Sequence, residues 1–171
     1  ELFFKVYNSK LIKTYNRPLI LIASKKLILN QMKMLGYKFN INLINQNMLN
    51  HKILDNKKIN LIDINFNCKN KNNKISFKSN KYINACFDLA LKLMKNKVGF
   101  ALINGPISKK HFLEKKFFGI TEYLAKKTNA KISGGPIFIM AHWANGSVAL
   151  IITIADAIPP TAEHKTAAPT A

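Results

Sequence analysis

Arginine, cysteine and acidic residues are scarce in this 171-residue chain. Arg17 is the only arginine among 27 basic residues, and only eight acidic residues oppose them, which leaves a formal net charge of +19. Such a charge attracts nucleic acids and anionic membranes. Sites for phosphates and base edges, however, usually depend on the planar fork of arginine. Lysine, asparagine and isoleucine are abundant together, as an AT-rich coding sequence would produce. We therefore expect no nucleic-acid partner, and a basic nucleic-acid-binding module stays an alternative.

Cys68 and Cys86 are the only cysteines. Two cysteines are too few for a disulfide framework, and no Cys-x-x-Cys pair is present. Free thiols are typical of a reducing compartment, so we expect a cytoplasmic protein. The first 15 residues lack the apolar core and cleavage site of a signal peptide. Because residue 1 is Glu1, we expect the sequence to start inside a longer reading frame or after processing.

One uncharged stretch, residues 132–155, is long enough to cross a membrane. It contains Gly134-Gly135-Pro136 and Asn145-Gly146. These residues would break a lipid-facing helix and leave backbone groups unpaired. Asn-Gly favours the two-residue turn of a β-hairpin. We expect two buried strands joined at this turn, and no membrane span.

Apolar runs of strand length alternate with helical stripes along the chain, which predicts an α/β fold. The stripe at 80–97, for example, places Ile83, Phe87, Ala90 and Met94 on one helix face. After about Lys131 lysine nearly vanishes. We expect one partial α/β domain over residues 1–154 and a disordered or atypical Ala/Pro/Thr-rich tail over 155–171. The predicted strands are 18–24, 38–44, 58–65 and 98–104, and the predicted helices are 2–13, 25–36, 80–97, a short one near 109–116, and one from Thr121.

Common catalytic motifs are missing. The chain has no Gly-x-Gly-x-x-Gly, no phosphate-binding Gly-x-x-x-x-Gly-Lys-Ser/Thr and no nucleophile elbow. The four histidines have no ligand spacing, so plain surface or hydrogen-bonded roles are expected for them. Asp63 and Asp88 fit solvated faces of a strand and a helix.

A candidate site remains where the strand 98–104 ends. Asn104-Gly105-Pro106 follows the strand, Lys109 comes next, and Gly119 to Glu122 begin a helix with Thr121 as its expected N-cap. Ligands of open α/β sheets bind just beyond the carboxyl ends of strands. A lysine and a helix start are both attractive to anions. The group suits a phosphorylated small molecule, although a strand end with ordinary surface lysines is an equal alternative.

The same residues carry a family resemblance. "FDLALKLMKNKVGFALINGPISKK" followed by "FFGITEYLAKKTNA" resembles the central segment of the 4-hydroxythreonine-4-phosphate dehydrogenase family, PdxA. "PLILIASKKLILNQMKMLGYKFN" extends the resemblance toward the start, and "VALIITI" extends it more weakly toward the end. Together these segments cover most of residues 1–154.

The resemblance implies an enzyme of pyridoxal phosphate biosynthesis. The expected reaction is the NAD-dependent oxidation of 4-phosphooxy-threonine, aided by a divalent metal and followed by decarboxylation. The implied fold is a three-layer α/β/α architecture like that of isocitrate and isopropylmalate dehydrogenases, and the implied assembly is a homodimer. The family's remaining metal ligand and most cofactor contacts belong to a C-terminal half, so we expect this chain to be truncated.

Carried over residue by residue, the resemblance implies substrate contacts at Gly105, Lys109 and Thr121. Ile120 stands where the family has a substrate-binding histidine, and Ile154 stands where it has a metal-binding histidine. A hydrocarbon side chain offers neither a metal ligand nor a hydrogen bond. We therefore expect an incomplete metal site and impaired activity. A catalytically inactive homologue with a structural or binding role is the alternative.

Overall fold

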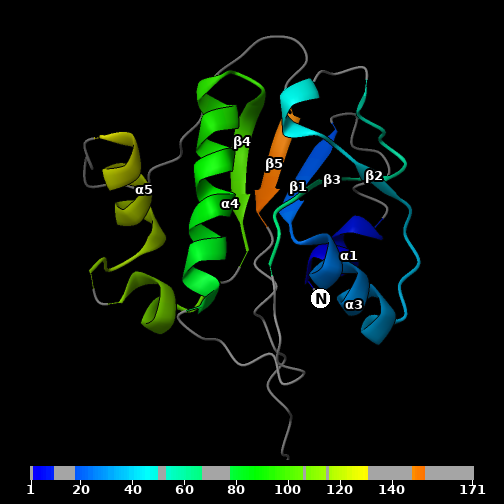
Figure 1. Cartoon of the computed structure of the whole chain (residues 1–171), viewed down its shortest axis with the longest axis horizontal. Coiled ribbons are helices and arrows are strands. Elements are labelled where there is room, and N and C mark those ends of the chain that lie inside the picture. The colour runs from blue at the N-terminus through cyan, green and yellow to red at the C-terminus, as the bar shows by residue number, and fades with distance from the viewer. Residues whose placement is uncertain are drawn as a thin grey trace, which may run out of the picture.

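Parallel strands form the centre of the molecule (Figure 1). The computed structural model describes residues 2–9, 18–49, 53–66, 78–105, 107–114, 116–130 and 148–152. Their five strands pair in the order β2-β3-β1-β5-β4, and every neighbouring pair is parallel. The α/β prediction is confirmed. The strands are β1 (Leu19–Ala23), β2 (Ile41–Leu43), β3 (Ile59–Asp63), β4 (Gly99–Asn104) and β5 (Val148–Ile152).

The described helices connect these strands close to the positions predicted from periodicity. α3 ends where Gly36 adopts a left-handed conformation, with φ of 73°, which glycine reaches without steric cost. η3 is a single π-helical turn. The helices are α1 (Leu2–Tyr7), α3 (Lys25–Leu35), the 3₁₀ turn η1 (Gln46–Met48), α4 (Lys78–Lys95), η3 (Lys109–Leu113) and α5 (Ile120–Thr128).

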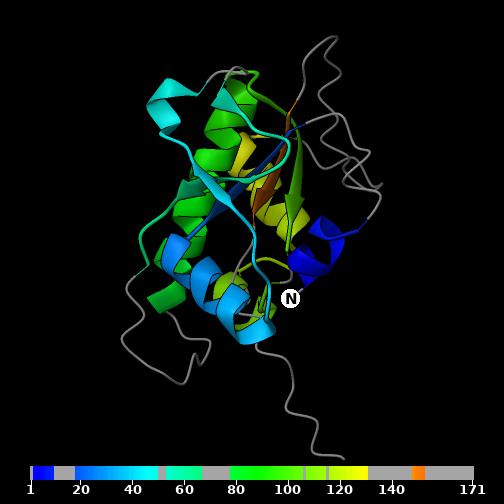
Figure 2. The ribbon, with the colours of Figure 1, turned by 90° about the vertical axis from the view of Figure 1, so that its right-hand side faces the viewer.

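Helices cover both faces of the sheet, because alternate side chains of a strand point to opposite faces. In β1, Ile20 and Ile22 belong to the core beneath α4, whereas Leu21 and Ala23 belong to the core shared with α1 and α3. Figure 2 shows α1 and α4 on opposite sides of the strands. The arrangement is a three-layer α/β/α fold, as the resemblance implied.

The strand β5 corrects the predicted hairpin. Its two neighbours in the sheet are β1 and β4, and both pair with it in parallel. A hairpin needs an antiparallel neighbour, and β5 has no free edge to offer one. The hairpin prediction was therefore wrong for β5. An uncharged apolar segment fits a central parallel strand as well as it fits a strand of a hairpin.

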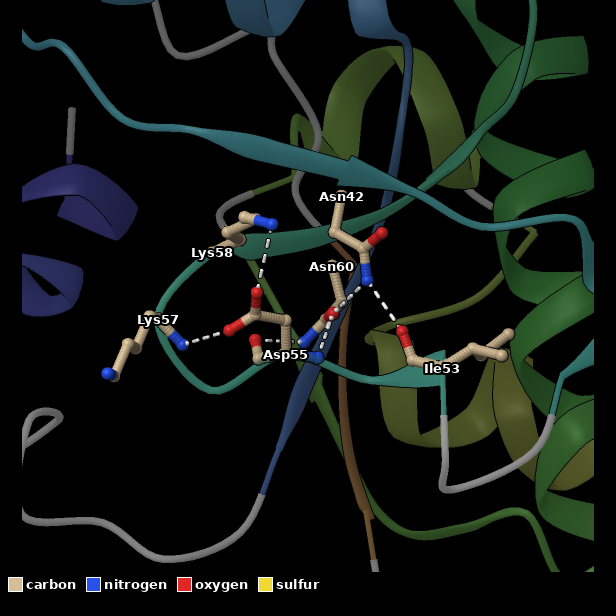
Figure 3. Close-up of polar contacts among 6 residues, drawn as sticks. All are labelled: Asn42, Ile53, Asp55, Lys57, Lys58 and Asn60. Atoms are coloured by element: carbon tan, nitrogen blue, oxygen red, sulfur yellow. Dashed lines mark hydrogen bonds and ion pairs between the residues drawn. The ribbon is translucent and has the colours of Figure 1, made fainter.

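A polar network fixes the amino ends of three strands (Figure 3). Asn60 in β3 is 2% exposed, and its amide nitrogen donates to the carbonyls of Leu19 and Asp55 at 3.1 and 3.0 Å. Its amide oxygen accepts from the Asn42 side chain and from the Asp55 backbone N–H, both at 2.9 Å. Asn60 thereby uses both donors and both acceptor positions inside the protein.

The Asp55 carboxylate extends this network. It accepts hydrogen bonds from the backbone N–H of Lys57 at 2.8 Å and pairs with the Lys58 ammonium at 3.1 Å. The Lys57 bond is the main cause that keeps the pKa of Asp55 below its ordinary value, and Lys58 adds to it. The ionised Asp55 carboxylate therefore stabilises the folded state. This stabilisation is fully present above the ordinary carboxyl pKa and is lost as the pH falls through the lower pKa of the folded state.

Some predictions fall outside the described residues. Ile154, Cys68 and the tail 155–171 are among these, as is the turn at Asn145-Gly146. Within the part of the chain that the structure describes, no helix is both long enough and apolar enough to span a bilayer.

Candidate functional site

The carboxyl end of β4 is the first part of the candidate site. β4 is an edge strand, and it ends at Asn104, whose side chain is exposed. The Asn104 amide nitrogen donates to the carbonyl of Gly105 at 3.1 Å, and Gly105 itself is partly buried. Since all the paired strands are parallel, their carboxyl ends meet at this edge of the sheet. The predicted position of Asn104 and Gly105 at a strand end is confirmed; their contact with a ligand stays a prediction.

The turn η3 follows and begins at Lys109. Its far end is anchored in the core, because Phe112 and Leu113 are 8% and 2% exposed. At its start, the Ser108 hydroxyl lies 2.9 Å from Nδ1 of His111, and the Ser108 carbonyl accepts from the backbone N–H groups of His111 and Phe112. These contacts hold the backbone at Lys109, which follows Gly105 by four residues in the sequence. What its ammonium contacts stays a prediction.

The start of α5 differs from the prediction. Gly119, not Thr121, is the N-cap, and the first helical hydrogen bond runs from Tyr123 N–H to the Gly119 carbonyl. Glu122 sits at the third helical position and accepts from the backbone N–H of Phe118 at 2.8 Å. In a capping box a glutamate at this position accepts from the N-cap N–H, whereas here the donor is one residue earlier. Thr121 is consequently an exposed residue of the first turn.

The Glu122 carboxylate also changes the electrostatics of this helix start. Free N–H groups and the helix dipole attract anions, but here a carboxylate already lies among them. Space is available nearby, because a Cβ atom added at Gly119 would meet no atom within 4 Å. A phosphate would have room beside Gly119 and would be repelled by Glu122. Lys109 is therefore the stronger candidate for the phosphate contact.

Ile120 is partly buried and packs against the core cluster around Phe87. Its hydrocarbon surface is used for packing against this core. This packing contributes to stability, and the lack of a polar substrate contact at Ile120 stays a prediction.

Aromatic and polar contacts hold η3 and α5 against α4. Tyr123 lies with its ring centroid 5.0 Å from that of Phe112 and 5.3 Å from that of Phe87. Its hydroxyl donates to the Asn84 side chain at 2.7 Å, and burial raises its pKa above the ordinary value. The structure brings η3 and α5 together through these rings. A common contact of Lys109 and Thr121 with one ligand stays a prediction.

A polar cluster beside η3 was not predicted from the sequence. Asn80 at the start of α4 donates from its side-chain amide to the carbonyl of His111 and to Oε1 of Glu114, both at 2.8 Å. Glu114 also accepts from the Lys116 ammonium at 3.0 Å, and this bond is the main cause that lowers the pKa of Glu114. No local sequence pattern could have found it, because Asn80 and Glu114 are 34 residues apart.

The ends of β1 and β3 form a second place of interest at the same edge. The connections after these adjacent strands lead to opposite faces, which is where α/β folds commonly bind ligands. The Asp63 carboxylate accepts from the backbone N–H of Lys25 at 2.7 Å, and the Tyr82 hydroxyl accepts from the N–H of Ser24 at 2.8 Å. Asp63 is exposed, as predicted, and it also caps α3. Both side chains are occupied by backbone N–H groups at the start of α3, which favours a structural role.

The described residues do not form a metal site. Among them, no three side chains of His, Cys, Asp or Glu gather as a metal ion requires. Cys86 is fully buried, and burial raises its pKa to about 12, so its thiol stays protonated at neutral pH.

Comparison with protein families matches residues 14–153 to the pyridoxal phosphate biosynthetic protein PdxA. No curated protein matches the chain significantly. The family match covers more than half of the sequence. It includes β1, α3 and the entire segment from α4 to β5, and so contains the strand end, η3 and the start of α5. The chain belongs to the PdxA family, whose members act in pyridoxal phosphate biosynthesis.

Proposed function

We propose that this chain is part of a cytoplasmic, homodimeric dehydrogenase that oxidises the secondary alcohol of 4-phosphooxy-threonine, with loss of carbon dioxide from the resulting keto acid. The family match over residues 14–153 carries the proposal. The position of Gly105 and Lys109 at the carboxyl end of β4 supports it, since this is where parallel α/β sheets bind their ligands.

The chain's own residues would bind and orient the substrate. The Lys109 ammonium would pair with the phosphate as a point charge, and Gly105 would let the ligand approach the backbone closely. The exposed hydroxyl of Thr121 would bond a polar group of the substrate, in the open space beside Gly119.

NAD and a divalent metal are implied by the family, and NAD would accept the hydride from the alcohol carbon. The described residues do not fit the metal, because they hold no cluster of three ligating side chains. Ile154, at the family's histidine position, lies outside the described residues. No step of the reaction is assigned to a metal here.

Loss of the Lys109 charge is expected to weaken phosphate binding. Lys109→Met should lower the affinity for 4-phosphooxy-threonine by roughly 10- to 100-fold, because a hydrogen bond to a charged group contributes about 1.5–3 kcal/mol. Isothermal titration calorimetry on the full chain measures the effect. Lys92→Met, which removes an exposed lysine of α4, is the matched control and should bind like wild type. Equal affinity in all three proteins would refute the role of Lys109.

Oxidation itself has a direct test. The full-length enzyme to which this chain is proposed to belong, supplied with 4-phosphooxy-threonine, NAD and Mg²⁺, should form NADH. Absence of NADH from folded protein that binds the substrate would sink the proposed activity and leave the binding site intact.

An inactive homologue with a binding role is the second candidate, and the packing of Ile120 against the core favours it. The double variant Ile120→His/Ile154→His tests this reading. If the chain keeps a degenerate site, the variant should gain measurable Zn²⁺ or Mn²⁺ affinity, because imidazole nitrogen is a good ligand for both. Metal titration followed by calorimetry reads the outcome, with Ile120→His alone as the control. An unchanged metal affinity would show that these positions do not share a site.

A further inference from the structure

The segment from Ser108 to Glu114 has an unusual backbone. η3 is a π-helical turn, a rare conformation that occurs frequently at functional sites. It ends at Glu114, which has φ of 48°, in the left-handed region that residues other than glycine seldom adopt. Such a conformation costs free energy and persists only where surrounding contacts hold it. The question is which contacts hold this segment.

Asn80 supplies two of the contacts from a different helix. Its side-chain amide donates one hydrogen bond to the backbone carbonyl of His111 and another to the carboxylate of Glu114, both at 2.8 Å. Carbonyls in the last turn of a helix lack a partner within that helix, and the first bond provides one for His111. The second bond holds the side chain of Glu114, the residue with the strained backbone. Asn80 therefore uses both of its N–H donors on this one segment.

The location of the contacts connects them to the candidate site. α4 packs on the sheet with its apolar face in the core, so its position is fixed and it can hold the short turn η3. η3 begins with Lys109, and the only residues between Lys109 and the end of β4 are 105–108. A shift of η3 on α4 would consequently move the backbone that carries Lys109 relative to Gly105.

We propose that Asn80 is a positioning residue of the candidate site: its two hydrogen bonds hold η3 and Glu114 in their strained arrangement and so place Lys109 at the end of β4 for an anionic ligand. This inference rests on the proposed function, because it requires the β4 end to bind phosphate. Asn80 itself touches no ligand in this scheme and acts through η3.

Two substitutions separate positioning from simple loss of a contact. Asn80→Ala removes both donors, and the affinity for inorganic phosphate and for 4-phosphooxy-threonine should fall roughly tenfold, since small misplacements of a binding group are costly. Asn80→Asp instead places a carboxylate against Glu114 and the His111 carbonyl. Two adjacent carboxylates share a proton as the pH falls, which restores one donor. The Asn80→Asp defect should therefore be larger than that of Asn80→Ala at pH 8 and should shrink at pH 5.

Affinities are compared as the ratio of variant to wild type at each pH, because the charge of phosphate changes between pH 5 and pH 8, and because His111, Glu114 and its partner Lys116 lie beside the substituted position. Asn96→Asp is the matched control: it makes the same change at an exposed position just after the far end of α4, and its ratio should stay near one at both pH values. Amide hydrogen exchange at Phe112, whose N–H bonds to the Ser108 carbonyl at 2.9 Å, reports on η3 directly and should accelerate in both Asn80 variants.

The outcomes are distinguishable. Faster exchange at Phe112 with weaker phosphate binding and recovery at low pH supports the inference. Phosphate affinities equal to wild type in both Asn80 variants overturn it and leave the proposed function standing. Absence of phosphate binding by wild-type protein overturns the proposed function and the positioning role together, and the exchange data then decide only whether Asn80 holds η3. Unchanged hydrogen exchange at Phe112 would also refute the claim that Asn80 holds η3 in place.

Discussion

Phe87→Ala is expected to lower the free energy of unfolding by about 3–5 kcal/mol, which is a large part of the stability of an ordinary domain. Phe87 is fully buried on α4, and its ring lies 5.9 Å from that of Phe112 and 5.3 Å from that of Tyr123, between centroids. One side chain thus joins α4 to both η3 and α5. Its removal leaves a cavity where three elements meet, and urea denaturation followed by circular dichroism measures the loss.

Two further substitutions keep this prediction testable even if Phe87→Ala does not fold. Phe87→Leu retains most of the volume and should cost less than about 1.5 kcal/mol if the cavity is the cause. Phe118→Ala removes a ring that is 91% exposed and should change stability by less than about 0.5 kcal/mol. Similar losses in Phe87→Ala and Phe118→Ala would contradict the placement of the core.

The sheet and its helices were predictable because their burial leaves a simple pattern. β1 is buried on both faces, so its sequence is a continuous apolar run, and the stripe on α4 marks the face that meets the sheet. The pairing partner of β5 was not predictable in the same way. Parallel and antiparallel central strands are both apolar, and the choice depends on which strands are nearby in space.

At the candidate site, the position of Lys109 beyond the strand end followed from chain order alone. The N-cap of α5 was misplaced by two residues, since glycine and threonine both occur as N-caps and the sequence does not show that the first helical hydrogen bond, donated by the Tyr123 N–H, ends at the Gly119 carbonyl. The contact between Asn80 and Glu114 spans 34 residues. It depends on how η3 packs on α4, which no local pattern encodes.

Asn60→Leu is expected to destabilise the fold by about 3 kcal/mol, because it leaves several part-buried polar groups without their partners at once and each such loss costs about 1–3 kcal/mol where water cannot replace the partner. The carbonyls of Leu19 and Asp55 lose their donor, and the N–H of Asp55 loses its acceptor. Leucine has the same number of side-chain heavy atoms as asparagine and the same branch point, so the substitution leaves no cavity and lost hydrogen bonding is the main cause. Urea denaturation gives the magnitude.

Asn42→Ala is the graded control. It removes one of the bonds to Asn60, at 2.9 Å, and the bond to the Ile53 carbonyl, while the remaining bonds of Asn60 persist. Its cost should be clearly smaller than that of Asn60→Leu. Equal costs, or an Asn60→Leu effect below about 0.5 kcal/mol, would show that the network is not cooperative.

The network and the candidate site lie at opposite edges of the sheet, and this separates stability from binding. Asn60 is the second residue of β3, at the amino edge, whereas Gly105 follows β4 at the carboxyl edge. The free-energy effects of substitutions at distant, independent positions usually add without coupling. Asn60→Leu protein that is still folded should therefore bind phosphate with wild-type affinity, whereas Asn80→Ala should lose affinity. A loss in both variants would mean that phosphate affinity follows global stability, and it would remove the reason to assign Asn80 a separate positioning role.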